Sequence, residues 1–382
     1  MKGYFDYNTS VPVSASMRKM LAEWLDSDPA FLGSGNSPLP PAWLERAHTT
    51  VSGTPGLEEY KLVFTSGATE SNRLAFEFLY HRYMGSGLTD SSFLRNKVLI
   101  SSIEHSSVYD QAKYLRNLGY DVLLIPCSKS GVLDMDFVED NAGPDTALIS
   151  VMYASGETGV VQPVRSVADI CERHGIHFHC DASQIPLRYS PSWHSLRAHT
   201  IAFSGHKLGA LSGVGMLLYR QKEPVSVFFG DSHTPRPGAA NRLGIQSLEE
   251  SWKCVHQDAG RKLTSLQTLR NLFEKELLSR IPEIKILGKD QVRLVNTSSI
   301  LLPNTVPHQT TAAIQKHGFQ VRALHGEGGM HTHSRTLLEM GVADSHSSAF
   351  SVSFGEANST AEVSAFLDVL EEANKSRARN NL

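Results

Sequence analysis

The sequence is poor in cysteine. Its 382 residues contain only four, at Cys127, Cys171, Cys180 and Cys254. Their spacing matches neither a CxxC metal motif nor a disulfide framework, so we expect each to be a small buried hydrophobic residue. No cysteine follows Cys254, and this absence restricts the chemistry considered below.

The sequence also lacks an excess of charge and long apolar runs. Lys and Arg number 36 against 39 Asp and Glu, which gives a formal net charge of −3. This balance, without a long basic run, argues against a nucleic-acid surface. No apolar stretch approaches the roughly 20 residues that span a membrane, and residues 1–6 lack the apolar core of a signal peptide. We therefore expect a cytoplasmic protein with no nucleic-acid or membrane partner.

Length and apolar patterning predict an α/β fold. The hydrophobic share of 41% and the charged share of 20% are ordinary for a globular protein. Short apolar runs alternate with amphipathic stretches, which is typical of a mostly parallel central sheet with helices on both faces. The strands are expected at residues 61–64, 97–100, 121–125, 147–152, 176–179, 200–203 and 215–219, with helices that include 107–118 and 164–174.

A smaller α+β domain is expected after a helix at residues 260–280. We expect the large domain to span residues 15–258 and the smaller one to combine 1–14 with 259–382, with an active-site loop near 322–333. The smaller domain is predicted to have strands at 297–302, 319–322 and 349–354 and helices at 308–317, 334–340 and 360–373.

Lys207 is the first candidate catalytic residue. It ends the sequence Ser204-Gly205-His206-Lys207, directly after the apolar run at residues 200–203. A lysine at the end of a strand can form a Schiff base with a carbonyl substrate or with pyridoxal 5′-phosphate (PLP). A lone lysine of this kind is more often simply solvated, so this interpretation depends on three other loops.

Two of these loops follow strands earlier in the chain. Residues 66–69, which include Ala68 and Thr69, open a helix whose N–H groups suit a phosphate. The alternative is an N-cap by Ser66 or Thr69. His105 follows the second strand, and its imidazole can stack on a flat ring and transfer protons. The alternative for His105 is a capping or core histidine.

The third loop contains Asp181 and Gln184, after the strand at residues 176–179. A carboxylate at this edge can pair with the protonated pyridine nitrogen of PLP, and Gln184 can donate to the phenolic oxygen. The alternative for Asp181 is a helix N-cap. Since ligands of such sheets bind beyond the carboxyl ends of the strands, we expect the four loops to converge on one ligand.

Together these loops resemble those of fold-type I PLP enzymes of the class V aminotransferase group, and in particular the cysteine desulfurases. The resemblance covers residues 4–220 and continues more weakly to the C-terminus. The segments that carry it are YFDYN (4–8), TSGATESN (65–72), EH (104–105), GETGVVQ (156–162), HCDASQ (179–184) and FSGHK (203–207).

The resemblance implies a role for each loop. Lys207 would carry the Schiff base and move protons, and His105 would stack on the PLP ring. Asp181 would pair with the pyridine nitrogen and Gln184 with the phenolic oxygen. The phosphate would be held by the loop of Ala68 and Thr69 and by Ser204 and His206. Such enzymes are usually homodimers that act on small amino-acid-like substrates, and we expect the same here.

The sequence departs from the desulfurase pattern on the substrate side. Desulfurases need a mobile cysteine in the small-domain loop, but Gly326 or Glu327 stands at that place, so the persulfide route lacks its thiolate. Ser351 stands where the family has an arginine for the substrate carboxylate. Arg322 or Arg335 could replace that arginine, although a surface charge is the alternative for Arg322.

Two smaller departures are Gly156 in place of an asparagine and Ala239 in place of a threonine that the partner subunit offers to the phosphate. The histidines at 325, 331 and 333 do not form an established metal pattern, so we expect no metal. A mobile glycine-containing loop that offers His325 and Glu327 to a substrate explains this segment better.

We therefore expect a PLP enzyme that cleaves a bond at Cβ of an amino-acid-like substrate, as a C–S lyase, desulfinase or decarboxylase-type enzyme, without a cysteine persulfide. Glu327 is a candidate acid or base for this reaction. Four alternatives stay open. They are a desulfurase whose sulfur acceptor lies elsewhere, an aminotransferase, an enzyme that forms carbon–carbon bonds, and a non-catalytic PLP-binding scaffold.

Overall fold

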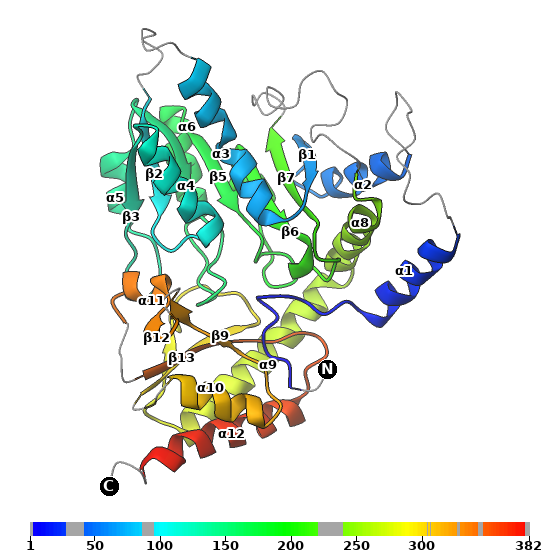
Figure 1. Cartoon of the computed structure of the whole chain (residues 1–382), viewed down its shortest axis with the longest axis vertical. Helices are drawn as coiled ribbons and strands as arrows, with labels where there is room; N and C mark the ends of the chain where they lie inside the picture. Colours follow the sequence, from blue (N-terminus) through cyan, green and yellow to red (C-terminus); the bar gives the residue numbers. More distant parts are fainter. Residues whose placement is uncertain are drawn as a thin grey trace.

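The computed structural model describes residues 3–27, 42–85, 95–220, 240–303, 305, 307–326, 329–342 and 347–378. Two main sheets organise these residues. A seven-stranded sheet has the order β1-β7-β6-β5-β4-β2-β3, and a four-stranded sheet has the order β10-β13-β9-β8. Figure 1 shows the large sheet above the small one, with α12 at the lower end of the molecule.

The large sheet confirms the predicted α/β architecture. Strands β2 to β6 pair in parallel, and β7 is antiparallel to both of its neighbours, β1 and β6. Each strand overlaps the one predicted there. The strands are β1 (Tyr60–Thr65), β2 (Lys97–Ser101), β3 (Asp121–Ile125), β4 (Thr146–Ser150), β5 (His177–Asp181), β6 (Thr200–Ser204) and β7 (Gly215–Arg220).

Helices cover both faces of this sheet because successive strand residues point to opposite sides. Val98 and Ile100 of β2 pack in the core that contains α3 and α4, whereas Leu99 packs in the core that contains α2, α6 and α8. The helices of this part are α1 (Ala15–Ser27), α2 (Ala42–Ser52), α3 (Ala68–Gly85), α4 (Ser106–Asn117), α5 (Met135–Asn141), α6 (Val164–His174), α7 (Trp193–Leu196), the 3-10 turn η3 (Gly205–Lys207) and α8 (Arg242–His256).

The small sheet has its own apolar core, in which Phe5 from the start of the chain packs with Phe273 and Phe366. The domain boundaries expected at residues 14 and 258 stay a prediction. The strands of this part are β8 (Lys285–Leu287), β9 (Thr297–Pro303), β10 (Arg322–Ala323) and β13 (Ser347–Ser353), with β11 (His325–Gly326) and β12 (Gly329–His333) in a separate ribbon. The helices are α9 (Ala259–Arg280), α10 (Pro307–Lys316), α11 (Arg335–Glu339) and α12 (Thr360–Ala378).

The strand predicted at residues 319–322 is wrong in its position, because β10 begins only at Arg322. The ring of Phe319 stacks on that of Phe5 with centroids 6.0 Å apart, and Gln320 bridges to the N-terminal segment. These contacts hold the residues before Arg322 against the start of the chain, so pairing with β13 starts later.

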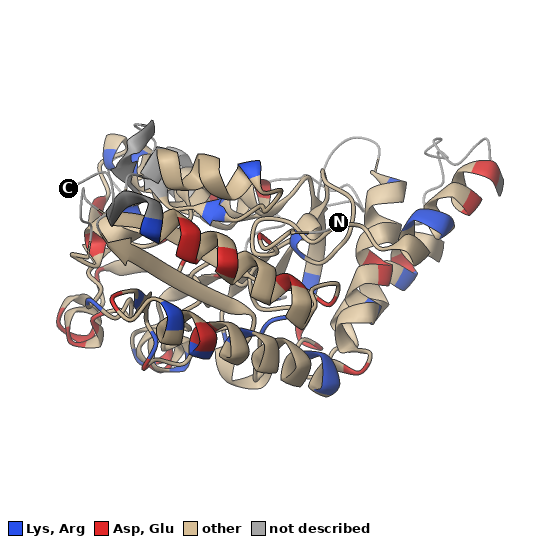
Figure 2. Ribbon diagram, turned by 90° about the horizontal axis from the view of Figure 1, so that it is seen from below, with Lys and Arg blue, Asp and Glu red and all other residues tan. Residues whose placement is uncertain are grey.

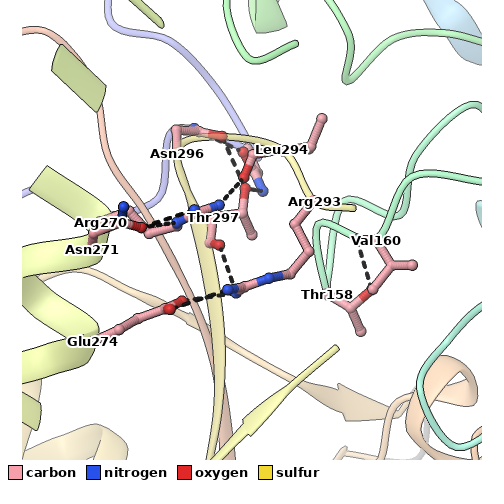
Figure 3. A network of polar contacts seen from close by, with 10 residues as sticks. Thr158, Val160, Arg270, Asn271, Glu274, Arg293, Leu294, Asn296 and Thr297 are labelled. Carbon is pink, nitrogen blue, oxygen red and sulfur yellow. Dashed lines mark hydrogen bonds and ion pairs between the residues drawn. The ribbon is translucent and has the colours of Figure 1, made fainter. Parts of the chain in front are cut away.

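A buried polar network fixes the segment that leads into β9 (Figure 3). Arg293 and Glu274 of α9 form an ion pair at 2.8 Å, with side chains only 4% and 10% exposed. Arg293 also donates to the carbonyl of Thr297 at 3.3 Å. The N–H of Leu294 bonds to the carbonyl of Gly159 at 2.8 Å, so the network also ties the small sheet to a loop of the large one.

Charges of both signs occur together on the surface. The helices seen from below in Figure 2 have both basic and acidic residues. Exposed pairs such as Lys19 with Glu23 contribute little to stability. Across the part of the chain that the structure describes, no helix combines the length and the apolar character needed to cross a membrane.

Candidate active site

The strand register brings two of the predicted loops together. Thr65, the last residue of β1, and Ser204, the last residue of β6, both pair with Gly215 at the start of β7. Strands two places apart in a sheet lie about 10 Å from each other. The loop at residues 66–69 and the loop that ends at Lys207 therefore leave the same edge of the sheet on either side of Gly215.

Gly215 has no room for a side chain. A Cβ there would lie 2.6 Å from the Cα of Gly67, so the backbone of the first loop rests directly on β7. Thr69 is exposed in the first turn of α3, where backbone N–H groups favour an anion. On the other side, Ser204 and His206 are joined by a hydrogen bond of 3.0 Å between Oγ and Nδ1.

Asp181 is held as a carboxylate at the end of β5, next to β6. It accepts hydrogen bonds of 2.9 Å from the N–H of Ser183 and from the side chain of Asn72. Burial alone would raise the pKa of Asp181, but the charge of Lys207 and these hydrogen bonds outweigh it and lower the pKa. The group is therefore ionised at neutral pH and suits a protonated ring nitrogen.

Asn72 links Asp181 to His105. The side-chain amide of Asn72 also donates to Ser107 Oγ at 2.9 Å, and that hydroxyl lies 2.9 Å from His105 Nδ1. His105 is the N-cap of α4, because its Nδ1 accepts a hydrogen bond from the N–H of Ser107. A capping histidine was the alternative interpretation of this residue in the sequence. Burial and the charge of Lys207 lower the pKa of His105, so its ring is neutral at neutral pH.

Lys207 has an amine with a lowered pKa. Burial is the largest cause, and the positive charges of Arg188 and Arg322 add to it, while Asp181 acts in the opposite direction. The resulting pKa is about 8, so a sizeable share of the amine is neutral near physiological pH. A neutral amine is the form that reacts with a carbonyl group.

Gln184 lies across Gly156. A Cβ at residue 156 would lie 2.5 Å from Gln184 Nε2, so Gln184 occupies the space in which the family's asparagine would begin. Gln184 Nε2 donates to the carbonyl of Asn8 at 3.0 Å, and Oε1 is buried without a hydrogen-bond partner in the described structure. The side chain thus has an unused polar atom at the predicted ligand site.

Arg322 points from the small sheet toward this edge of the large one. Its guanidinium lies 3.6 Å from Glu157, whose carboxylate also accepts from Ser334 Oγ at 2.6 Å. Arg322 is paired directly with Ser351 of β13, so the two side chains share one face of the small sheet. Ser351 is 1% exposed, and its hydroxyl is buried without a partner in the described structure.

Arg335 has other partners. It donates to the carbonyl of Ser102 at 3.1 Å and to that of Glu104, and it stacks on the ring of Tyr109 at 3.7 Å. These contacts fasten the start of α11 to the loop after β2. They leave Arg322 as the better candidate for a substrate carboxylate.

Glu327 and Ala239 lie outside the described residues, and His325 is described only as backbone in β11. Within the described ranges, no group of three His, Cys, Asp or Glu side chains could hold a metal ion.

Three contributors to the site had no predicted role, namely Asn72, Glu157 and Arg188. Asn72 follows Thr69 by three residues and so lies one turn further along α3, on the same side. That spacing was the only available signal. Arg188 and Glu157 act through contacts with distant segments, for which the sequence has no local pattern.

The donor set fits a phosphorylated pyridine ring. An ionised carboxylate at Asp181 and an amine of lowered pKa at Lys207 match a ring nitrogen and an aldehyde. The Gln184 amide, whose Nε2 has a second N–H besides the one donated to Asn8, matches the phenolic oxygen. Thr69 and the hydrogen-bonded pair Ser204 and His206, in the loops on either side of Gly215, supply donors that suit a phosphate.

The chain matches a known protein family over most of its length. Residues 42–366 match the family model described as Aminotransferase class-V. The cysteine desulfurase IscS of Buchnera aphidicola subsp. Acyrthosiphon pisum is 31% identical over 283 residues, which covers 71% of this chain and 67% of that protein.

Two solved structures share the fold. A NifS-like protein from Rickettsia africae has a TM-score of 0.82 at 23% identity, covering 98% of this chain and 100% of that one. The apo structure of a cysteine desulfurase from Thermococcus onnurineus has a TM-score of 0.79 at 22% identity, covering 98% and 95% of the two chains. The expected fold-type I architecture is thereby confirmed.

Proposed function

Since this chain belongs to the class-V aminotransferase family, whose members use PLP, we propose that it cleaves a bond at the Cβ atom of an amino-acid-like substrate without a cysteine persulfide. The chain is a PLP-dependent enzyme related to the cysteine desulfurases. The absence of any cysteine after Cys254 carries the proposal, because the segment at residues 321–333 then offers no thiolate.

The remaining cysteines are poor nucleophiles or lie elsewhere in the sequence. Burial raises the pKa of Cys127 to about 11, and it also raises the pKa values of Cys171 and Cys180. A thiol with a raised pKa is almost fully protonated at neutral pH, and only the thiolate attacks sulfur. Cys254 is exposed, but it lies in α8, far along the chain from the loop that carries the thiol in desulfurases.

Each side chain of the site has a separate role in this proposal. Bound PLP withdraws electrons from the substrate Cα. Asp181 holds the ring nitrogen, and Gln184 holds the phenolic oxygen. His105 covers the ring, while Thr69, Ser204 and His206 bind the phosphate. Lys207 Nζ removes the proton from Cα. A thiolate leaving group would then depart from Cβ with the bonding electrons, whereas a sulfinate or carboxylate group would depart as SO2 or CO2 and leave those electrons on Cβ, which takes up a proton.

Arg322 binds the substrate α-carboxylate in this proposal. Its 3.6 Å contact with Glu157 is long for an ion pair, and its face of the sheet is otherwise occupied by the small side chain of Ser351. A guanidinium can hold a carboxylate through two parallel hydrogen bonds. The substrate would therefore compete with Glu157 for Arg322.

Replacing Arg322 with alanine is expected to raise KM by roughly 10- to 100-fold, because a charged hydrogen bond contributes about 1.5–3 kcal/mol. Initial rates over a range of substrate concentrations measure this change. Glu157→Gln is the matched variant and should lower KM, since it weakens the competing contact. An unchanged KM in Arg322→Ala would assign the carboxylate to another residue.

The named relatives favour a second candidate, which is cysteine desulfuration with a sulfur acceptor elsewhere, for example on a partner protein. The observation behind it is the 31% identity to a cysteine desulfurase. The proposed homodimer is common to both candidates. They differ in what becomes of the sulfur and of the three-carbon product.

A panel of amino acids separates the two candidates. The purified PLP-loaded protein would be incubated with cysteine, cysteine sulfinate, cystine, aspartate and alanine, and alanine, pyruvate, ammonia, sulfide and sulfite would be measured together. Pyruvate with ammonia, or alanine with sulfite, supports cleavage at Cβ without a persulfide. Alanine from cysteine with a persulfide trapped on this chain would contradict the proposal, and transamination without loss from Cβ would do so too.

A further inference from the structure

Arg188 is a buried cation without an acidic partner among its described contacts. It is 1% exposed and lies four residues after Gln184. Its guanidinium donates to three backbone carbonyls, of Tyr7 at 2.6 Å, Pro186 at 3.0 Å and Lys207 at 3.0 Å, and its Nε is left without a partner. Arginine is rarely buried so fully unless it is paired, since the loss of hydration is costly.

The ionisable group that favours the charge on Arg188 is Tyr4. Burial and the nearby Asp6 raise the pKa of Tyr4 to about 12, so its phenol is neutral at physiological pH. The positive charge of Arg188 is therefore compensated by carbonyl dipoles. Its own pKa is lowered by burial, but only to about 10, so the guanidinium stays charged.

The contacts of Arg188 join three separate segments at Lys207. One amino group of the guanidinium bonds both to Tyr7 in the N-terminal segment and to Lys207 in the turn after β6. A neighbouring bond of 2.9 Å from the N–H of Val11 to the carbonyl of His206 closes the same junction. The backbone of the reacting lysine is thus fastened directly by Arg188.

Arg188 also differs from the other charges around the lysine amine. Asp181 favours the ammonium form and Arg322 disfavours it, and the neutral rings of His105 and His206 lie close enough to sense the lysine charge. Arg322 comes from the small sheet and would be neutralised by a bound carboxylate. Arg188 bonds to the backbone of the lysine and keeps its charge whether or not substrate is present.

We propose that Arg188 is a positioning residue for Lys207, which holds the lysine carbonyl against the N-terminal segment and presents a permanent positive charge to the lysine amine. This inference rests on the proposed function only in taking Lys207 as the residue bonded to PLP. It does not depend on which amino acid is the substrate.

The test compares two variants. Arg188→Gln keeps a hydrogen-bond donor but loses the charge, whereas Arg188→Lys keeps the charge but loses the planar guanidinium group with its several donors. In the PLP-loaded protein, the visible absorbance of lysine-bound PLP is titrated with pH. We expect its pKa to rise by about one unit in Arg188→Gln and to stay near the parent value in Arg188→Lys. Arg270→Gln is the matched control, because Arg270 is another buried arginine that donates to a backbone carbonyl, that of Leu294. It should leave the titration unchanged.

Hydrogen exchange tests whether Arg188 holds the lysine carbonyl against the N-terminal segment. The amide of Val11 should exchange faster in both Arg188 variants, because both weaken the junction between Tyr7 and Lys207. A parent-like absorbance titration in Arg188→Gln, or equal shifts in both variants, would overturn the role of the charge. If the Val11 amide exchanged as slowly in both variants as in the parent, Arg188 would not hold the lysine carbonyl against the N-terminal segment. Since no amino-acid substrate is used, failure of the substrate proposal in the panel leaves these results interpretable.

Discussion

Replacing Lys207 with alanine is expected to lower kcat by at least about a thousandfold, which lies within the range that one general acid or base contributes. The expectation has two physical reasons. The amine has a pKa of about 8, so it can accept a proton near neutral pH, and it is fixed at the carboxyl end of β6 beside Asp181. Alanine removes the proton carrier and also the amine that bonds to PLP.

The measurement combines turnover with absorbance. Lys207→Ala should lose the visible absorbance of lysine-bound PLP, while turnover is followed with the best substrate of the panel. Lys97→Ala is the matched control, because Lys97 begins strand β2 of the same sheet and is paired with Asp145 at 2.9 Å. It should keep the absorbance and the activity. A Lys207→Ala protein with parent-like absorbance and turnover would show that another amine does the work.

The sequence predicted the large sheet well because its strands are short, apolar and separated by polar loops. Lys207, Asp181 and His105 each follow such a strand, so their convergence could be expected from the geometry of parallel sheets. The family resemblance added the phosphate residues Ser204 and His206. These assignments need only local sequence and one general rule of topology.

The remaining parts of the site depend on contacts between segments far apart in the chain. Arg188 looks like an ordinary surface charge in the sequence, and only the packing of the N-terminal segment buries it. Glu157 contacts Arg322 of the small sheet and Ser334 at the start of α11, both more than 160 residues later. The early strand expected at residues 319–322 failed for the same reason, because Phe319 packs on Phe5.

The carboxylate of Asp181 keeps its negative charge at the centre of the site. Glu104 lies close enough to interact with it, but burial, and then the charge of Asp181 itself, raise the pKa of Glu104 to about 8. Burial dominates at Glu104, whereas at Asp181 the charge of Lys207 and two hydrogen-bond donors outweigh it. The two acids therefore separate into a neutral one and an ionised one, as closely spaced carboxyl groups do.

Asp181→Asn should consequently weaken PLP binding by about 100-fold, since it removes a charged hydrogen bond worth up to about 3 kcal/mol. The substitution keeps the shape and the acceptor for the Ser183 N–H, but its amide would face the donor of Asn72. Equilibrium dialysis of PLP against the variant measures the dissociation constant without any substrate. Asn72→Ala serves for comparison and should have a smaller effect, because it removes one donor and leaves the charge. If Asp181→Asn bound PLP as tightly as the parent, Asp181 would not be the partner of the ring nitrogen.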